Sequence, residues 1–190
     1  MYDESYYKTG NYIDYLQRKD RYAKLAENVL DHLNKMNLNK NPILDFGCAI
    51  GLLMDNLNEV GYEVDGVDIS EWALEQCRAK NLNVSTTPNY EKQYGITFAL
   101  DVLEHLTEEQ LSTFVNKIQT KVLVFRMPTV EEGDTDYYLS VARRDKTHII
   151  KWTKNEWRTF FKENGYLPID LNLPSIYCAL GGYSGIAIKV

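Results

Sequence analysis

Cysteines, long apolar runs and basic clusters are all scarce in this chain of 190 residues. Its three cysteines, Cys48, Cys77 and Cys178, are too few and too scattered for a disulfide framework or a zinc knuckle. No apolar run approaches the roughly 20 residues that a membrane helix needs. The first five residues have neither the basic flank nor the apolar segment of a signal peptide. We therefore expect a cytoplasmic protein with no membrane partner.

Positive charge is also sparse, because 21 Lys and Arg stand against 27 Asp and Glu, for a net charge of −6. Nucleic-acid-binding proteins depend on clustered Lys and Arg to displace counterions. No such stripe stands out here, so the sequence predicts no nucleic-acid partner and favours a small-molecule substrate. The length and the 44% of apolar residues suit a single domain spanning 1–190. The pattern leaves the oligomeric state undetermined.

Short apolar runs alternate with helical patterns along most of the chain. Strands are predicted at 43–46, 63–68, 82–85, 96–100, 121–126, 167–171 and 185–190. Helices are predicted at 13–36, 52–60, 70–80, 107–119 and 153–165, the last two opened by capping boxes. This order predicts an α/β three-layer sandwich with a mainly parallel, seven-stranded sheet. No helix separates the last two strands, so we expect them to form an antiparallel C-terminal hairpin.

The most informative stretch is 43–51, where an apolar pair runs into Asp45 and small residues then alternate at Gly47, Ala49 and Gly51. This pattern predicts a buried strand that turns sharply into a helix and leaves its backbone open to a ligand. Asp68 follows the next strand, 17 residues beyond Gly51. A glycine-rich first turn with an acid after the second strand is typical of a nucleoside site. The turn accepts the polar tail of the ligand, and the acid accepts its ribose hydroxyls.

Two kinds of nucleoside cofactor bind to such a turn. A nicotinamide site would read G-x-G-x-x-G, whereas here the third glycine is off register. The carboxylate of Asp45 would also repel a pyrophosphate, and it would attract the ammonium group of a cationic ligand. A nicotinamide oxidoreductase is therefore a minor alternative.

At this point the residues resemble class I S-adenosylmethionine-dependent methyltransferases. The stretch from Asp45 to Gly51 matches their D/E-x-G-x-G-x-G motif, Asp68 matches their ribose-binding acid, and 100–106 matches their fourth-strand motif. The resemblance implies a Rossmann-like fold and S-adenosylmethionine as the cofactor. It places Ile69 against the adenine ring. The cofactor-binding residues that it implies are Asp45, Gly47, Cys48, Ala49, Gly51, Asp68, Ile69 and Asp101.

Two departures from the family pattern concern the cofactor. Ala49 stands where the family has its middle glycine, and a left-handed conformation there would cost about 1–2 kcal/mol. The family often has an acid after the third strand that accepts a hydrogen bond from the adenine amino group. Here Thr86, Thr87, Asn89 or the backbone would have to replace that acid, and the sequence does not choose among them.

The residues Asp101, Glu104 and His105 follow the fourth strand, and His148 lies in a later Thr-His pair. This spacing resembles ubiquinone-pathway O-methyltransferases and small-RNA 2′-O-methyltransferases, in which two carboxylates and two histidines hold a divalent cation. By that resemblance the metal ligands are Asp101, Glu104, His105 and His148. Asp101 is one methylene shorter than the family's glutamate, so it alternatively faces the methionine end of the cofactor. Catalysis without metal, by His105, His148 and Glu104, and a purely structural role stay open as well.

Two segments flank the alternating core. Residues 1–37 form an N-terminal arm and helix, rich in tyrosines that either line the pocket or pack the arm. Residues 127–152 are too long for a plain connection and predict an insertion that covers the acceptor site. Within the insertion, Tyr137, Tyr138, Arg143 and Arg144 either grip a sugar, phosphate or carboxylate or form a solvated loop.

These observations predict a methyltransferase that acts on an oxygen, or less favourably a nitrogen, of a small molecule. The tyrosines and arginines of the insertion favour a sugar or a nucleotide-sugar as the acceptor. The alternative from another class is a catalytically silent, methyltransferase-like binding module. Ala49 and the missing acid after the third strand support that alternative.

Overall fold

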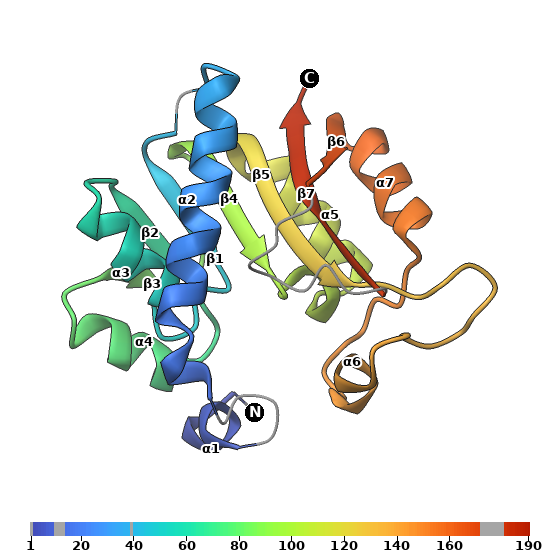
Figure 1. Ribbon diagram of the computed structural model, residues 1–190, viewed down its shortest axis with the longest axis horizontal. Coiled ribbons are helices and arrows are strands. Elements are labelled where there is room, and N and C mark those ends of the chain that lie inside the picture. Colours follow the sequence, from blue (N-terminus) through green and yellow to red (C-terminus); the bar gives the residue numbers. More distant parts are fainter. Residues whose placement is uncertain (1, 10–13, 39, 172–180) are drawn as a thin grey trace.

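A seven-stranded sheet forms the centre of the computed structural model, which describes residues 2–9, 14–38, 40–171 and 181–190 (Figure 1). Its strands stand in the order β3-β2-β1-β4-β5-β7-β6. They are β1 (Ile43–Phe46), β2 (Val64–Val67), β3 (Asn83–Ser85), β4 (Gln93–Leu100), β5 (Gln119–Pro128), β6 (Tyr166–Asp170) and β7 (Gly182–Lys189). Among these strands β7 alone runs in the opposite direction to the other six, and its pairings with β5 and β6 are antiparallel. The expected α/β fold with a mainly parallel sheet and an antiparallel C-terminal hairpin is confirmed.

Helices cover both faces of the sheet. One face carries α2 (Lys19–Lys35), α3 (Leu52–Glu59) and α4 (Glu71–Arg78), and the other carries α5 (Glu108–Lys117) and α7 (Lys154–Glu163). Alternate residues of each strand serve the two layers, so that Val122 and Val124 pack on the first face and Leu123 and Phe125 on the second. All four of these side chains are fully buried, which is why β5 is a continuous apolar run.

The element boundaries differ from the sequence prediction mainly where polar residues belong to strands. β4 begins at Gln93 and β5 at Gln119, and these two residues pair with each other at the strand ends. Backbone hydrogen bonds extend both strands beyond their apolar residues. The prediction relied on the pattern of apolar side chains, so it could not detect these extensions. The long first helix is shorter than expected, because a 3₁₀ turn η2 (Tyr15–Gln17) precedes α2. The predicted start at Ile13 lies outside the described residues.

The two flanking segments lie at the carboxyl edge of the sheet. The N-terminal arm carries the short helix α1 (Glu4–Lys8), and the segment after β5 carries α6 (Ser140–Arg144). Figure 1 shows both short helices beyond the end at which the parallel strands finish, with the C-terminus at the opposite edge. None of the described helices is long and apolar enough to cross a membrane.

The sheet order reverses between β1 and β4. From β1 the chain proceeds outward through β2 and β3, and it then returns to place β4 on the other side of β1. In open parallel sheets such a switch leaves a crevice at the carboxyl ends of the two strands. The turn after β1 and the segment after β4 therefore meet at the position where this fold binds ligands.

The surroundings of Gly51 show that the turn between β1 and α3 is tightly packed. It adopts φ +77°, and an added Cβ would overlap the side chain of Leu82 and lie 3.1 Å from Cys77 Sγ. Gly61 has a similar φ of +89°, but nothing lies within 4 Å of its added Cβ. We expect Gly61→Ala to lower the free energy of unfolding by about 1–2 kcal/mol, the cost of the left-handed conformation alone. Gly51→Ala should cost clearly more, and equal losses in urea unfolding would contradict this packing.

Candidate functional site

The turn after β1 adopts the left-handed conformation at three alternating residues. Gly47, Ala49 and Gly51 have φ angles of +81°, +48° and +77°. The amides of Gly47 and Cys48 both donate to the Val67 carbonyl, at 2.7 and 3.0 Å, which fixes the turn against the end of β2. The sequence pattern of small residues thus follows from backbone geometry, and Ala49 carries the strain expected at that position.

Asp68 holds the same turn from the neighbouring strand. Its Oδ2 accepts a hydrogen bond from the Ala49 amide at 2.9 Å, and its Oδ1 accepts one from the Ser70 amide at 2.8 Å. Burial raises the pKa of Asp68, and the hydrogen bonds from Ser70 and Ala49 oppose that rise. Each carboxylate oxygen has a further electron pair, so Asp68 can brace the turn and still accept from ribose hydroxyls.

Asp45 lies beneath this turn. Its side chain is buried, with 5% of the residue exposed. Burial, and after it the charge of Asp68, raises the pKa of Asp45 to about 7. The buried Asp45 and the partly buried Asp68 thus place two carboxyl groups near each other, where a positively charged ligand would bind favourably.

A cavity of about 1040 Å³ opens at the carboxyl edge of the sheet. Five of the predicted cofactor residues line it, namely Gly47, Ala49, Asp68, Ile69 and Asp101. The other three, Asp45, Cys48 and Gly51, are not among the described lining residues and instead shape the turn from behind. Ile69 is 74% exposed, as a residue that packs on a planar ligand would be before binding. Of the candidates for the adenine amino group, Thr86 lines the cavity.

The segment after β4 forms the other wall of this cavity. A 3₁₀ turn η3 (Leu103–His105) presents Glu104, which is completely buried. The backbone carbonyl of Glu104 accepts hydrogen bonds from the amides of Ile149 and Ile150, at 2.8 and 3.0 Å. This double contact attaches the segment after β5 to the end of β4, and it brings His148 beside Glu104 across 44 residues of sequence.

Glu104, His105 and His148 form a cluster whose potential ligand atoms all lie within 4.8 Å of one another. Glu104 Oε1 lies 4.0 Å from His105 Nε2 and 3.8 Å from His148 Nε2. Neither oxygen of Glu104 has a hydrogen-bond partner among the described residues. A buried carboxylate without partners is costly unless a cation or a proton compensates it. The donor set of one carboxylate and two imidazoles suits a divalent transition metal.

In the metal-free cluster at pH 7 burial keeps all three groups uncharged, and a cation would bind Glu104 by displacing its proton. Burial, and secondarily the charge of Asp145, raises the pKa of Glu104 to about 8. Burial and the neighbouring His148 lower the pKa of His105 to about 4, and burial also lowers that of His148. Both imidazoles are therefore neutral at pH 7, which is the state that binds metal ions.

Asp101 is not brought into this cluster, although the family resemblance implied it as a metal ligand. Its Oδ1 accepts a hydrogen bond from Arg126 Nε at 2.7 Å, and the two side chains form a salt bridge. Asp101 itself has φ +53°, and its amide donates to the Arg126 carbonyl at 2.8 Å. The shorter side chain and the adjacent guanidinium keep this carboxylate on the cavity wall, so the structure favours the alternative in which it faces the cofactor.

Asp145 and Thr147 join the cluster instead, from the segment after α6. Asp145 Oδ2 lies 3.8 Å from His148 Nε2, and Thr147 Oγ1 lies 2.9 Å from His105 Nδ1. Burial opposes ionisation of Asp145, but hydrogen bonds from Thr147 outweigh it and hold its pKa below the ordinary value. The sequence assigned a role to neither residue, although Thr147 is the threonine of the Thr-His pair and Asp145 stands two residues before it.

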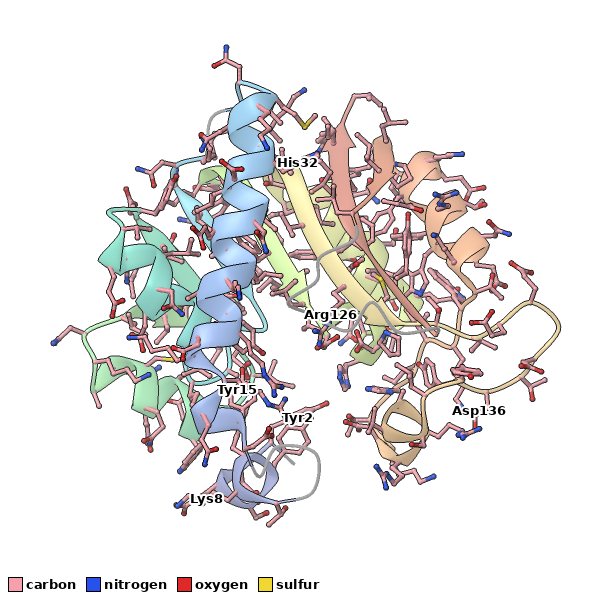
Figure 2. All side chains as sticks on the ribbon, viewed as in Figure 1. Tyr2, Lys8, Tyr15, His32, Arg126 and Asp136 are labelled. Atoms are coloured by element: carbon pink, nitrogen blue, oxygen red, sulfur yellow. The ribbon has the colours of Figure 1, made fainter. Side chains whose placement is uncertain are left out.

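The N-terminal arm also reaches the cavity. Tyr2 and Tyr6 line it, and Tyr2 Oη lies 3.4 Å from His105 Nδ1. Figure 2 shows Tyr2 near the carboxyl edge, in the same region as Arg126. Tyr7 also lines the cavity and stacks on Trp72, with ring centroids 5.3 Å apart. Tyrosines of the arm thus both line the pocket and pack the arm. Tyr12 lies outside the described residues.

The side chains that suggested a sugar acceptor lie elsewhere. Tyr137 is buried and donates its hydroxyl to the Ile150 carbonyl at 2.6 Å, so its role is to hold the segment in place. Tyr138, Arg143 and Arg144 are exposed and are not among the described lining residues. The cavity wall on this side consists of Leu139, Ser140, Val141 and Ala142.

Comparison with known proteins identifies the family to which this site belongs. Residues 16–170 match the methyltransferase domain family. The chain is a member of that family. The membership confirms the resemblance to class I S-adenosylmethionine-dependent methyltransferases, and the nicotinamide alternative does not fit it.

Relatives with curated names match part of the methyltransferase. A ubiquinone biosynthesis O-methyltransferase from Hydrogenovibrio crunogenus is 30% identical over 120 residues, which span 57% of this chain and 46% of that protein. A second, from Paraburkholderia phymatum, is 22% identical over 57% of this chain and 47% of its own length. The chain thus spans about half the length of the curated relatives that it matches.

Solved structures share the fold over nearly the whole chain. Magnesium protoporphyrin IX methyltransferase from Synechocystis PCC 6803, with bound SAH, superposes with a TM-score of 0.65 at 20% identity. That match covers 97% of this chain and 91% of the other. A SAM-dependent methyltransferase from Archaeoglobus fulgidus gives a TM-score of 0.64 at 21% identity, covering 92% and 99% of the two chains.

The strain at Ala49 of the methyltransferase predicts a stabilising substitution. Ala49→Gly should raise the free energy of unfolding by about 1 kcal/mol, because glycine adopts a positive φ without steric cost. Ala23→Gly, inside α2, is the matched control and should lower it by about 1 kcal/mol. Urea unfolding of both variants measures the difference. A loss of stability in Ala49→Gly as large as in the control would contradict the strain.

The raised pKa of Asp45 predicts a pH dependence of stability for the cofactor-free protein. Between about pH 4 and pH 7 the folded state binds more protons than the unfolded chain, so stability falls as pH rises through this window. Asp45→Asn should equal the wild type near pH 4 and exceed it at pH 8, by at most about 4 kcal/mol. Urea unfolding at the two pH values tests this. Parallel pH profiles for the two proteins would show that Asp45 ionises normally.

Proposed function

We propose that this protein transfers a methyl group from S-adenosylmethionine to a hydroxyl oxygen of a small molecule, with the help of a divalent cation. The observation that carries the proposal is the buried Glu104–His105–His148 cluster on the wall of the cofactor cavity. The similarity to ubiquinone biosynthesis O-methyltransferases supports an oxygen acceptor. The predicted insertion 127–152 starts two residues too early, because Met127 and Pro128 pair with β7 as the end of β5. Its remaining residues would cover the acceptor side of the cavity, since Val141, Ala142 and His148 line it.

The cofactor half of the cavity provides electrostatic attraction and a backbone cradle. The turn from Gly47 to Gly51 accepts the polar tail, and Asp68 accepts the ribose hydroxyls. The buried carboxyl group of Asp45 and the partly buried one of Asp68 attract a ligand that carries a sulfonium and an ammonium group. A bound positive charge would favour the ionised form of Asp45 and so lower its pKa. It would thereby offset the unfavourable burial of this carboxylate in the free protein.

Glu104, His105 and His148 would hold the cation. When bound, such a cation lowers the pKa of an acceptor hydroxyl and fixes the position of its oxygen. The three side chains are buried or nearly so, which excludes bulk water from their atoms. Three protein ligands would leave room for the acceptor oxygen. In the transfer the bond between sulfur and the methyl carbon breaks as the oxygen–carbon bond forms, S-adenosylhomocysteine leaves, and the hydroxyl proton passes to water. The step requires mainly in-line positioning of cofactor and acceptor within one cavity of about 1040 Å³.

The lining of the whole cavity suggests what kind of acceptor would fit beside the cofactor. Apolar side chains such as Met127, Leu139 and Val141 line the cavity together with the aromatic rings of Tyr90 and Phe114. These surfaces suit a flat or apolar body that carries a hydroxyl group. A sugar or nucleotide-sugar acceptor has weaker support, because the tyrosines and arginines of the insertion lie away from the cavity.

Binding and turnover can be separated experimentally. We expect calorimetry to show binding of S-adenosylhomocysteine, weakened about 10–100-fold in Asp68→Asn through loss of charge-assisted hydrogen bonds. We also expect the protein to bind Mn²⁺, and His148→Ala to weaken that binding more than ~100-fold. This loss would exceed the one usually seen when a residue that only hydrogen-bonds to a metal ligand is replaced. His32→Ala, in the last turn of α2, is the matched control and should bind Mn²⁺ like the wild type.

A screen of catechols and other hydroxylated aromatics with Mn²⁺ would then measure formation of S-adenosylhomocysteine. Turnover that requires Mn²⁺ would support the proposal. Turnover that persists with a chelator would replace it by base catalysis through His105 or His148. Cofactor binding without turnover on any acceptor would favour the silent binding module.

A further inference from the structure

A hydrogen-bonded chain of Asp145, Thr147 and His105 lies directly behind the cluster. Thr147 donates twice to Asp145 Oδ1, from its amide at 2.9 Å and from its hydroxyl at 2.5 Å. The same Thr147 oxygen lies 2.9 Å from His105 Nδ1. The three groups come from two segments, because His105 follows β4 whereas Asp145 and Thr147 follow α6.

The direction of these hydrogen bonds is set by the number of protons. A hydroxyl group has one proton, and in Thr147 it points to the Asp145 carboxylate. Toward His105 the Thr147 oxygen therefore has only electron pairs. Nδ1 of His105 must carry a proton to form its contact with that oxygen, and the neutral ring then has a free electron pair on Nε2. This Nε2 is the atom that faces Glu104 Oε1, at 4.0 Å.

We propose that Asp145 and Thr147 are positioning residues that fix His105 as the Nδ1–H tautomer, with Nε2 free to bind the cation. The inference rests on the proposed metal centre, and it adds two residues that do not themselves need to touch the cation. Outer-shell partners of this kind orient a ligand histidine and usually affect metal affinity 10–100-fold. The contact with Thr147 holds the His105 ring in place. Asp101 does not contribute to this, because it is held by Arg126 and does not join the cluster.

A competing arrangement defines what the experiment must exclude. Tyr2 Oη lies 3.4 Å from the same Nδ1, and a tyrosine hydroxyl that donated to it would require the proton on Nε2. In that tautomer Nε2 would have no electron pair for a cation. The Thr147 contact is shorter by 0.5 Å, from 3.4 to 2.9 Å, and its direction is fixed by Asp145.

Nitrogen-15 NMR of the histidine rings in the metal-free protein measures the tautomer directly. The chain has three histidines, and His32 lies at the far end of α2, so it serves as an internal reference (Figure 2). We expect the wild type and Thr147→Ser to show a protonated Nδ1 and an unprotonated Nε2 at His105. Thr147→Val keeps the shape of the side chain without its hydroxyl, and it should show a mixture of tautomers. Amide signals that stay unchanged away from the site would show that the variants are folded.

Titration with Mn²⁺ then links the tautomer to the cation. Thr147→Val and Asp145→Ala should each weaken Mn²⁺ binding about 10–100-fold, whereas Thr147→Ser should stay close to the wild type. The double variant should lose little more than either single variant, because both act through one chain of hydrogen bonds.

Three results would overturn the positioning role of the hydrogen-bonded chain. They are an Nε2–H tautomer in the wild type, an unchanged tautomer in Thr147→Val, or a loss of Mn²⁺ affinity in Asp145→Ala alone. If the wild type shows the expected tautomer but binds no Mn²⁺, the hydrogen-bonded chain is supported and the metal centre of the proposed function is overturned.

Discussion

Two backbone hydrogen bonds to the Glu104 carbonyl are the interaction on which the candidate active site depends. They join the amides of Ile149 and Ile150 to the 3₁₀ turn after β4, and so they fix His148 beside Glu104 and His105. Tyr137 strengthens this attachment, because its buried hydroxyl donates to the Ile150 carbonyl. Together with the contact between Thr147 and His105, these hydrogen bonds hold the segment after β5 against the end of β4.

The same attachment buries the carboxyl group of Glu104, which is energetically unfavourable. Glu104 is fully buried, neither oxygen has a hydrogen-bond partner among the described residues, and its pKa is raised to about 8. Such a group contributes little to stability, since burial of an unpaired charge or polar atom is costly. Its position is understandable if a ligand compensates it. Asp45, at the end of β1, shows the same condition on the cofactor side, with a pKa of about 7. Glu104 lines the ligand cavity, whereas Asp45 lies behind the turn that forms part of its wall.

Much of the fold follows from local patterns in the sequence. Alternating apolar runs and helical periods predict the strands and helices, since each pattern reflects burial on one or two faces. The turn at Gly47, Ala49 and Gly51 could be recognised because left-handed backbone restricts which residues fit. The extensions of β4 and β5 to Gln93 and Gln119 could not, because backbone pairing between polar residues leaves no apolar signal.

For the site, the sequence alone determined which chemical groups are present and in what order: the cofactor turn, the acid Asp68, and the Glu104–His105 pair. Only the tertiary structure decided how they are used. It paired Asp101 with Arg126, and it brought Asp145 and Thr147 to His105 in its place. It also turned Tyr137 inward to hold the segment, away from any acceptor. The physical reason is that a sequence motif fixes spacing along one segment, whereas contacts between segments depend on how two loops pack at the sheet edge.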